Sequence, residues 1–215
     1  MIVCWSIKGG CGTTVVAATF ALLSSRSQPT LFVDLAGDAA AVLGLPDPAS
    51  PGVADWLASP TADAAALLRL AVPANHSLDI LPLGAGSSAA LHPTLPERWS
   101  SLATALGNLD QQVVVDAGVG CPQPPLVHEA QASLLVTRSC YLSLRRVVAS
   151  GSVPTGIVLL LEPGRALTAT DVERAVGAPV VAQVPYDPAI ARSVDAGLLA
   201  ARLPSSLSHS LRRAA

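Results

Sequence analysis

The feature that most constrains the fold is the segment Lys8-Gly9-Gly10-Cys11-Gly12-Thr13-Thr14, which we call the 8–14 loop. It follows an apolar run over residues 1–7 that predicts a buried strand, and it precedes an apolar run over residues 14–23 that predicts a helix. Glycines between a strand and a helix let backbone N–H groups turn toward an anion, and the helix N-terminus adds a positive partial charge. The segment therefore predicts a phosphate-binding loop.

The 8–14 loop differs from the common phosphate-loop pattern, G-x-x-x-x-G-K-[ST]. Ile7 replaces the first glycine, and Thr13 replaces the lysine that would contact the β- and γ-phosphates, whereas Thr14 keeps the hydroxyl for Mg²⁺. Lys8 is the only lysine in the chain, and the other twelve basic residues are arginines. Because the two side chains are not interchangeable at a phosphate, this placement indicates a local requirement rather than chance.

These residues resemble the deviant Walker A motif of the ParA/MinD superfamily, K-G-G-x-G-K-[ST]. In that family the first lysine reaches across a dimer to the nucleotide of the other subunit, and Lys8 matches its position. The resemblance implies a site for ATP and Mg²⁺ with the nucleotide contacted by Lys8, Gly9, Gly10, Cys11, Gly12, Thr13 and Thr14. With threonine at the second lysine, the loop is most similar to the CpaE/TadZ branch, whose members localise pilus machinery to a cell pole.

Two later apolar runs, residues 30–33 and 111–115, each end in an acid, Asp34 and Asp116. Ligands of open parallel sheets bind outside the carboxyl ends of the strands, so both acids are expected near the 8–14 loop. Asp116 has the placement of a Walker B acid that holds Mg²⁺ directly or through water. We therefore predict Thr14, Asp34 and Asp116 as metal-binding residues.

The segment after Asp34 resembles the first switch of the family, where a second acid, two residues on, positions the attacking water. Ala36 stands at that place in this chain. Asp38 is the candidate replacement and the second predicted catalytic residue beside Lys8. The alternative role for Asp38 is a helix N-cap, which a short acid favours.

Two segments bear on recognition of the base. The strand over residues 179–184 and the turn Pro185-Tyr186-Asp187 resemble the family's last strand and the turn beside the base, so Pro185 is predicted to contact the cofactor. Many relatives end the preceding strand with an Asn that contacts adenine. Leu161-Glu162 stand there in this chain, which leaves base specificity open.

The composition fits a single domain over residues 1–215. Of 215 residues, 51% are hydrophobic and only 13% are charged, which favours a three-layer α/β/α fold with a buried, mostly parallel sheet, the P-loop NTPase fold of the ParA/MinD type. A net charge of −2 argues against a broad basic surface for DNA. The chain shows no secretory pattern and no run long enough to span a bilayer, so we expect a cytoplasmic protein.

The resemblance also suggests partners. It implies a homodimer around the nucleotide and a partner protein that reads the nucleotide state, with recruitment to a pole or the inner membrane surface. Arg145-Arg146 are either a DNA contact or a solvated helix face. Leu207 and Leu211, followed by two arginines, are either an amphipathic membrane-binding tail or a frayed helix end, since one leucine pair buries little area.

Three functions remain open from the sequence. Loss of the charge at Thr13 and of the acid at Ala36 predicts slow or absent hydrolysis, because phosphoryl transfer depends on such groups. The first function is a nucleotide-dependent dimeric positioning switch for a pilus or secretion apparatus, a chromosome or a division site. The second is a slow ATPase that uses Asp38 in DNA partitioning or membrane-site positioning. The third is a nucleotide-free scaffold.

Overall fold

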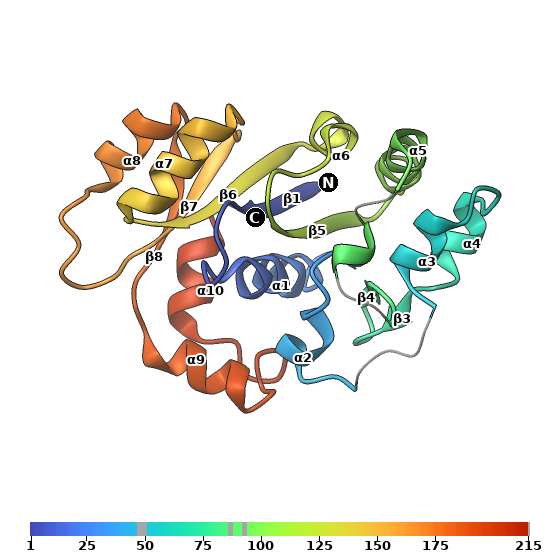
Figure 1. Cartoon of the computed structure of the whole chain (residues 1–215). Helices are drawn as coiled ribbons and strands as arrows, with labels where there is room; N and C mark the ends of the chain where they lie inside the picture. The colour runs from blue at the N-terminus through green and yellow to red at the C-terminus, as the bar shows by residue number, and fades with distance from the viewer. Residues whose placement is uncertain (47–50, 86–87, 92–93, 215) are drawn as a thin grey trace.

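An eight-stranded sheet forms the centre of the molecule (Figure 1). The computed structural model describes residues 1–46, 51–85, 88–91 and 94–214. The strand order is β3-β4-β2-β5-β1-β6-β7-β8, and every pair is parallel except β3–β4. The strands are β1 (Ile2–Ser6), β2 (Thr30–Asp34), β3 (Val72–Pro73), β4 (Leu78–Leu81), β5 (Gln112–Val119), β6 (Ala132–Arg138), β7 (Gly156–Leu160) and β8 (Val180–Val184).

Helices cover both faces of the sheet, which confirms the predicted three-layer α/β/α architecture. One face carries α1 (Thr13–Ser24), α2 (Ala39–Leu43), α9 (Pro188–Asp195) and α10 (Ser205–Leu211). The other carries α3 (Val53–Ala58), α4 (Ala64–Leu68), α5 (Pro96–Gly107), α6 (Pro124–Glu129), α7 (Tyr141–Ser150) and α8 (Ala169–Val176). A short 3-10 helix, η1, spans Ser88–Leu91.

The central strand β1 shows why the sheet is apolar on both sides. Ile2 and Cys4 pack into the core under α1, whereas Val3 and Trp5 pack into the cores of the opposite face. Successive side chains of a strand point to opposite faces, so a strand covered on both sides reads as a continuous apolar run. The indole of Trp5 satisfies its one polar group by donating to Ser133 Oγ at 3.0 Å.

The strand order also places the candidate site. The chain leaves β1 toward α1 on one face and leaves the adjacent β5 toward α6 on the other face. Where neighbouring strands send the chain to opposite sides, a crevice opens at their carboxyl ends. Cys4 pairs with Asp116 in this register, so the 8–14 loop and the acid of β5 emerge at the same edge.

The C-terminal segment differs from both predicted alternatives. Helix α9 ends at Asp195, and the chain turns at Gly197 with a φ of 63°. A side chain at Gly44 would meet the carbonyl oxygen of Gly197 at 1.8 Å, so this turn packs directly on the end of α2. Leu207 and Leu211 are 2% and 0% exposed in the core beside α1, and form neither a membrane-binding face nor a frayed end.

Two further differences are local. The proline-rich segment 121–125, for which no helix was predicted, enters α6 at Pro124, where proline suits the first helical turn because no N–H is needed there. The short antiparallel β3 was also not predicted. Arg145 and Arg146 are exposed on α7, which is compatible both with a DNA contact and with a solvated helix face. Within the residues described, no helix combines the length and the apolarity needed to cross a membrane.

Candidate nucleotide-binding site

The 8–14 loop joins β1 to α1 and has the backbone geometry of an anion site. Gly10 and Gly12 adopt φ values of 76° and 78°, a left-handed conformation that glycine reaches without strain. Gly12 is the N-cap of α1 and offers no side chain to the first-turn amides. The free N–H groups at the start of this twelve-residue helix are therefore available to a phosphate.

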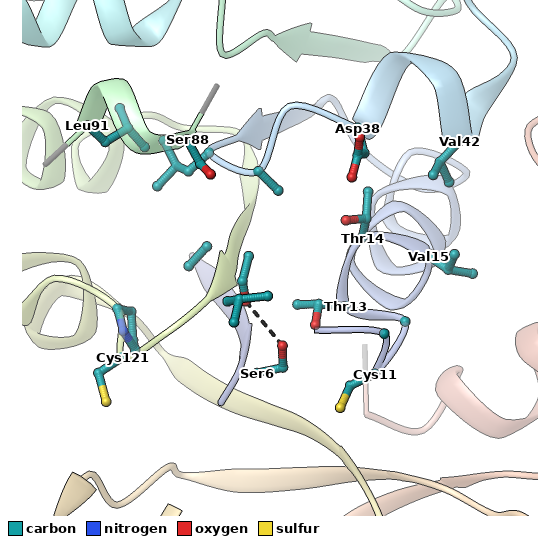
Figure 2. A pocket seen from close by; sticks show the side chains of 18 of the residues that line it. Ser6, Cys11, Thr13, Thr14, Val15, Asp38, Val42, Ser88, Leu91 and Cys121 are labelled. Carbon is teal, nitrogen blue, oxygen red and sulfur yellow. Dashed lines mark hydrogen bonds between the residues drawn. The ribbon is translucent and has the colours of Figure 1, made fainter. Parts of the chain in front are cut away.

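A cavity of about 670 Å³ opens beside the loop (Figure 2). Its walls come from the 8–14 loop, from the segment between β2 and α2, from the end of β5, and from Ser88, Leu91 and Trp99. Among the described residues that line it, Asp38 is the only charged side chain, and neither lysine nor arginine contributes. The residues that line the cavity therefore offer an anion backbone N–H groups and hydroxyls, to which a bound cation could be added.

Asp116 is the most unusual group in the site. It is 0% exposed, its Oδ1 accepts a hydrogen bond from the Gly118 amide at 3.0 Å, and its buried Oδ2 has no partner among the described residues. Burial raises the pKa of Asp116 to about 6, against the lowering effects of the Thr14 hydroxyl and the Gly118 amide. A buried carboxylate oxygen without a partner, next to a hydroxyl, fits Mg²⁺.

Protein side chains alone do not complete a metal site here. No group of three or more His, Cys, Asp or Glu residues that could hold an ion occurs in the described part of the chain. Mg²⁺ retains several waters and is often bound by one or two protein groups together with substrate phosphates. Thr14 and Asp116 are placed for this role.

Asp34 holds the loop that follows β2 through backbone hydrogen bonds. Its Oδ1 accepts from the amides of Ala36 at 2.9 Å and Gly37 at 2.6 Å, and its Oδ2 accepts from Ala39 at 3.0 Å. Burial raises the pKa of Asp34, and these backbone hydrogen bonds oppose the shift. Both oxygens thus hold the loop that leads into α2, and the metal-binding role of Asp34 stays a prediction.

Asp38 lies in the wall of the cavity. The sequence left open whether this residue is a catalytic acid or a helix N-cap. It precedes α2 at the N-cap position, but its side chain makes no capping hydrogen bond, because Asp34 supplies the carboxylate for the loop amides. Figure 2 shows the Asp38 carboxylate pointing toward Thr14. Ala36 also lines the cavity and offers no polar group there. The structure thus brings Asp38, Thr14 and the 8–14 loop together.

The predicted residues that do not line this cavity are Lys8, Gly9, Asp34, Asp116 and Pro185. Lys8 is half-buried and does not line it; burial raises the pKa of the nearby Cys11 thiol, and the charges of Arg138 and then Lys8 oppose that shift. Pro185 is exposed just after β8. Its neighbour Tyr186 lines a second, shallow hollow of about 340 Å³ with Glu162, Pro163, Gly164 and Arg165.

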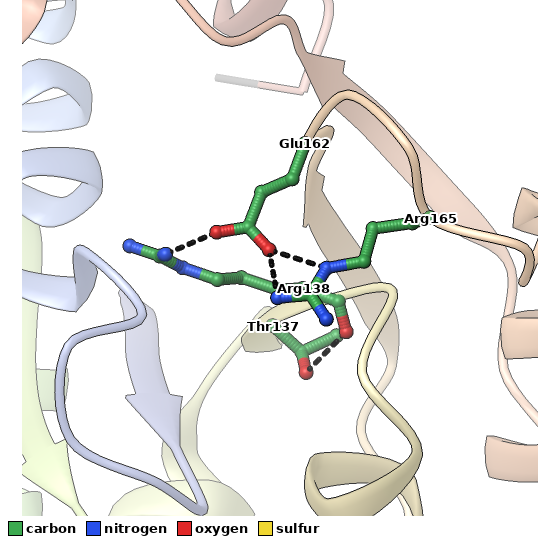
Figure 3. A network of polar contacts seen from close by, with 4 residues as sticks. All are labelled: Thr137, Arg138, Glu162 and Arg165. Atoms are coloured by element: carbon green, nitrogen blue, oxygen red, sulfur yellow. Dashed lines mark hydrogen bonds and ion pairs between the residues drawn. The ribbon is translucent and has the colours of Figure 1, made fainter.

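Sequence reasoning missed an ion-pair network at the ends of β6 and β7 (Figure 3). Arg138 Nη1 donates to Glu162 Oε1, and Arg165 donates from Nε to Glu162 Oε2 at 2.7 Å. Hydrogen bonds from Arg165, and then those from Arg138, lower the pKa of Glu162 against the opposing effect of burial. In the sequence, only the place of Arg138 at the end of an apolar run could have indicated this network; in the structure that run is β6, which lies next to β1.

Comparison with known proteins identifies the fold. Neither a family model nor a curated protein matches the sequence. The chain is similar to the crystal structure of a ParA family ATPase from Chlorobium tepidum, with a TM-score of 0.79 and 25% identity over 98% of this chain and 94% of that one. It is also similar to the septum site-determining protein MinD of Pyrococcus horikoshii, complexed with Mg-ADP, with a TM-score of 0.76 and 20% identity over 99% and 93%.

A third similar structure is the MinC:MinD cell division protein complex of Aquifex aeolicus, with a TM-score of 0.71 and 20% identity over 91% of this chain and 85% of that one. Together these likenesses confirm the predicted fold, an α/β P-loop NTPase of the ParA/MinD type. Identities of 20–25% establish the architecture, whereas the chemistry must be argued from the residues of this chain.

Proposed function

We propose that this protein is a nucleotide-dependent switch that binds ATP with Mg²⁺ and hydrolyses it slowly or not at all. The observation that carries the proposal is the buried Oδ2 of Asp116, which has no hydrogen-bond partner among the described residues and lies beside Thr14 of the 8–14 loop. A buried charge without a partner is costly, and a bound cation offsets that cost. Mg²⁺ held between Thr14, Asp116 and nucleotide phosphates would do so.

Weak turnover follows from what the cavity lacks. Thr13 places a hydroxyl where the common loop has a charged lysine, and Ala36 places a methyl group where relatives carry an acid. Removing one group that stabilises transition-state charge commonly costs on the order of 10²–10³ in rate. Binding depends less on these groups, because the backbone amides and the metal still hold the phosphates.

A switch of this kind acts through an assembly. Lys8 lies outside the cavity of its own chain, which suits the family's arrangement in which this lysine contacts nucleotide in a second copy. One similar structure is a complex of MinD with MinC, and by analogy a partner protein would read the bound state here. The threonine at position 13 favours the CpaE/TadZ type of role, polar localisation of a pilus apparatus.

The test is size-exclusion chromatography with light scattering after incubation with Mg-ATP, followed by identification of the nucleotide in the peak. We expect a dimer that carries intact ATP, and we expect Thr14→Ala to remove both the nucleotide and the dimer. A monomer without nucleotide, with an unchanged melting temperature in Mg-ATP, would overturn the proposal in favour of a scaffold, since a ligand of the native state must stabilise it.

A second candidate is a slow ATPase, and the position of Asp38 favours it. The carboxylate lines the cavity and points toward Thr14, where it could orient a water molecule (Figure 2). In this case the peak would return to monomer with ADP. Asp38→Ala should then abolish phosphate release while leaving ATP binding intact, whereas under the switch proposal it changes neither.

A further inference from the structure

We propose that Arg138 supplies, from within the same chain, the positive charge at the nucleotide phosphates that Thr13 lacks, with Glu162 holding the guanidinium in place. This inference rests on the proposed nucleotide binding and adds a phosphate-binding residue to it. It concerns the β6 side of the 8–14 loop, opposite to the side where Asp116 lies.

The need for such a residue comes from the charge of the site. A nucleoside triphosphate brings several negative charges, and the only charged side chain among the described residues that line the main cavity is the acid Asp38. Mg²⁺ neutralises two of these charges. Phosphate sites of this kind ordinarily add a basic side chain at the β- and γ-phosphates, where Thr13 stands here.

Sheet geometry places Arg138 beside the loop. Within β6, Val136 packs into the core under α1, so Arg138, two residues further on, projects to the same face as α1. Arg138 pairs in register with Leu160 of β7. Leu160 Cδ2 lies 3.2 Å from the position that a Cβ on Gly12 would occupy, so this end of the sheet packs directly against the 8–14 loop.

Electrostatics agree with this placement. Burial raises the pKa of the Cys11 thiol, and among the charged groups that act on it Arg138 has the largest effect, ahead of Lys8. Cys11 is the central residue of the 8–14 loop, so the guanidinium charge reaches the loop itself. In Figure 3 the Arg138 side chain extends from β6 toward the pale blue N-terminal segment that carries the loop and α1.

The guanidinium retains donors for an anion. Its Nη1 is bound to Glu162 and its Nε is buried, but the side chain is 38% exposed, so the rest of the guanidinium remains open to an anion. Glu162 is fastened in turn by Arg165, through Nε at 2.7 Å and Nη2 at 2.5 Å. Arg165 therefore orients the carboxylate that holds Arg138, and an arginine fork held in this way suits a phosphate.

The experiment measures the affinities of AMP, ADP and ATP, each with Mg²⁺, for the wild type and three variants. Arg138→Gln removes the charge, Arg138→Lys keeps it, and Arg165→Gln is the matched control, because it removes the other arginine on the same carboxylate. We expect Arg138→Gln to weaken ATP binding about 10- to 100-fold, the range for a charge-assisted hydrogen bond, and AMP binding much less. Arg138→Lys should recover part of the loss.

The outcomes separate this inference from the proposed function. If the wild type binds none of the three nucleotides, the proposed function fails. If the wild type binds ATP and Arg138→Gln weakens all three equally, or weakens them no more than Arg165→Gln does, Arg138 is a structural residue and the inference is overturned. Arg138 is 38% exposed, so its substitution should leave the melting temperature of the free protein nearly unchanged, which is checked in parallel.

Discussion

The two sides of the 8–14 loop carry opposite kinds of charge. On the side of β5 and β2 lie three acids, Asp34, Asp38 and Asp116, and among the residues described no basic side chain lines the cavity on this side. On the side of β6 and β7, two arginines share one carboxylate. The first side thus carries a surplus of negative charge, and the second carries a surplus of one positive charge.

Burial makes this difference energetically important. Asp116 is 0% exposed, so its charge is poorly solvated and its oxygen lacks a partner. The side chains of Arg138, Glu162 and Arg165 are 38%, 20% and 45% exposed, so water screens their interactions. The acid side should therefore respond strongly to protons and cations, and the ion-pair side should respond weakly.

Asp116→Asn tests the acid side and should have the largest effect on stability. The folded pKa of about 6 lies above the ordinary value of 3.8, so the folded state holds the proton more tightly and stability falls as pH rises between these values. A shift of this size corresponds to about 3 kcal/mol lost by the wild type at pH 7.5. In chemical denaturation without nucleotide, the variant should be more stable at pH 7.5, with a gain that disappears near pH 4.

Mg-ATP provides the control for this prediction. It should raise the melting temperature of the wild type, because the cation offsets the buried charge, and should leave the Asn variant nearly unchanged. A wild type whose stability rises from pH 4 to pH 7.5 in parallel with the variant would contradict a destabilising charge at Asp116.

The acid side could be predicted from sequence in its positions but not in its roles. Local patterns are sufficient to place Asp34 and Asp116 at strand ends, because an apolar run followed by an acid is visible in the chain itself. The surroundings of Asp34 and Asp38 depend on how the loop before α2 turns its amides, three of which donate hydrogen bonds to Asp34. Such a conformation has no short sequence pattern.

The ion-pair side could not be predicted, because it depends on which strands are neighbours. Arg138 and Glu162 are 24 residues apart, and they meet only because β6 and β7 pair beside β1. The burial of Leu207 and Leu211 has the same cause, since it requires α10 to return to α1. The sequence predicted the α/β architecture and the 8–14 loop, whereas contacts between distant segments needed the structure.

Thr13→Lys tests whether the acid side lacks a positive charge. Its effect on the free energy of nucleotide binding should lie between the effects of the other two substitutions on the free energy of unfolding. Thr13 lines the cavity at the start of α1, where the common loop carries lysine. We expect about tenfold tighter binding of Mg-ATP and measurable phosphate release, less than the 10²–10³ that such groups supply where the whole site is adapted to them. Thr13→Gln is the control, because it adds length without charge. Equal affinities for the Lys and Gln variants would show that charge is not what this side lacks.

Glu162→Gln makes the same acid-to-amide change on the ion-pair side, and should have the smallest effect on stability. Arg165, and then Arg138, hold the pKa of Glu162 below its ordinary value, so this group stabilises the fold above that value and loses its effect as pH falls. The direction is opposite to that of Asp116. Because the pairs are partly exposed, we expect a loss below about 1 kcal/mol at pH 7.5, reduced further at high salt.

Chemical denaturation of this variant in parallel with Asp116→Asn measures both changes in the free energy of unfolding, which should have opposite signs. A loss at Glu162 as large as the gain at Asp116 would mean that the two sides are equally desolvated and that the contrast between them fails.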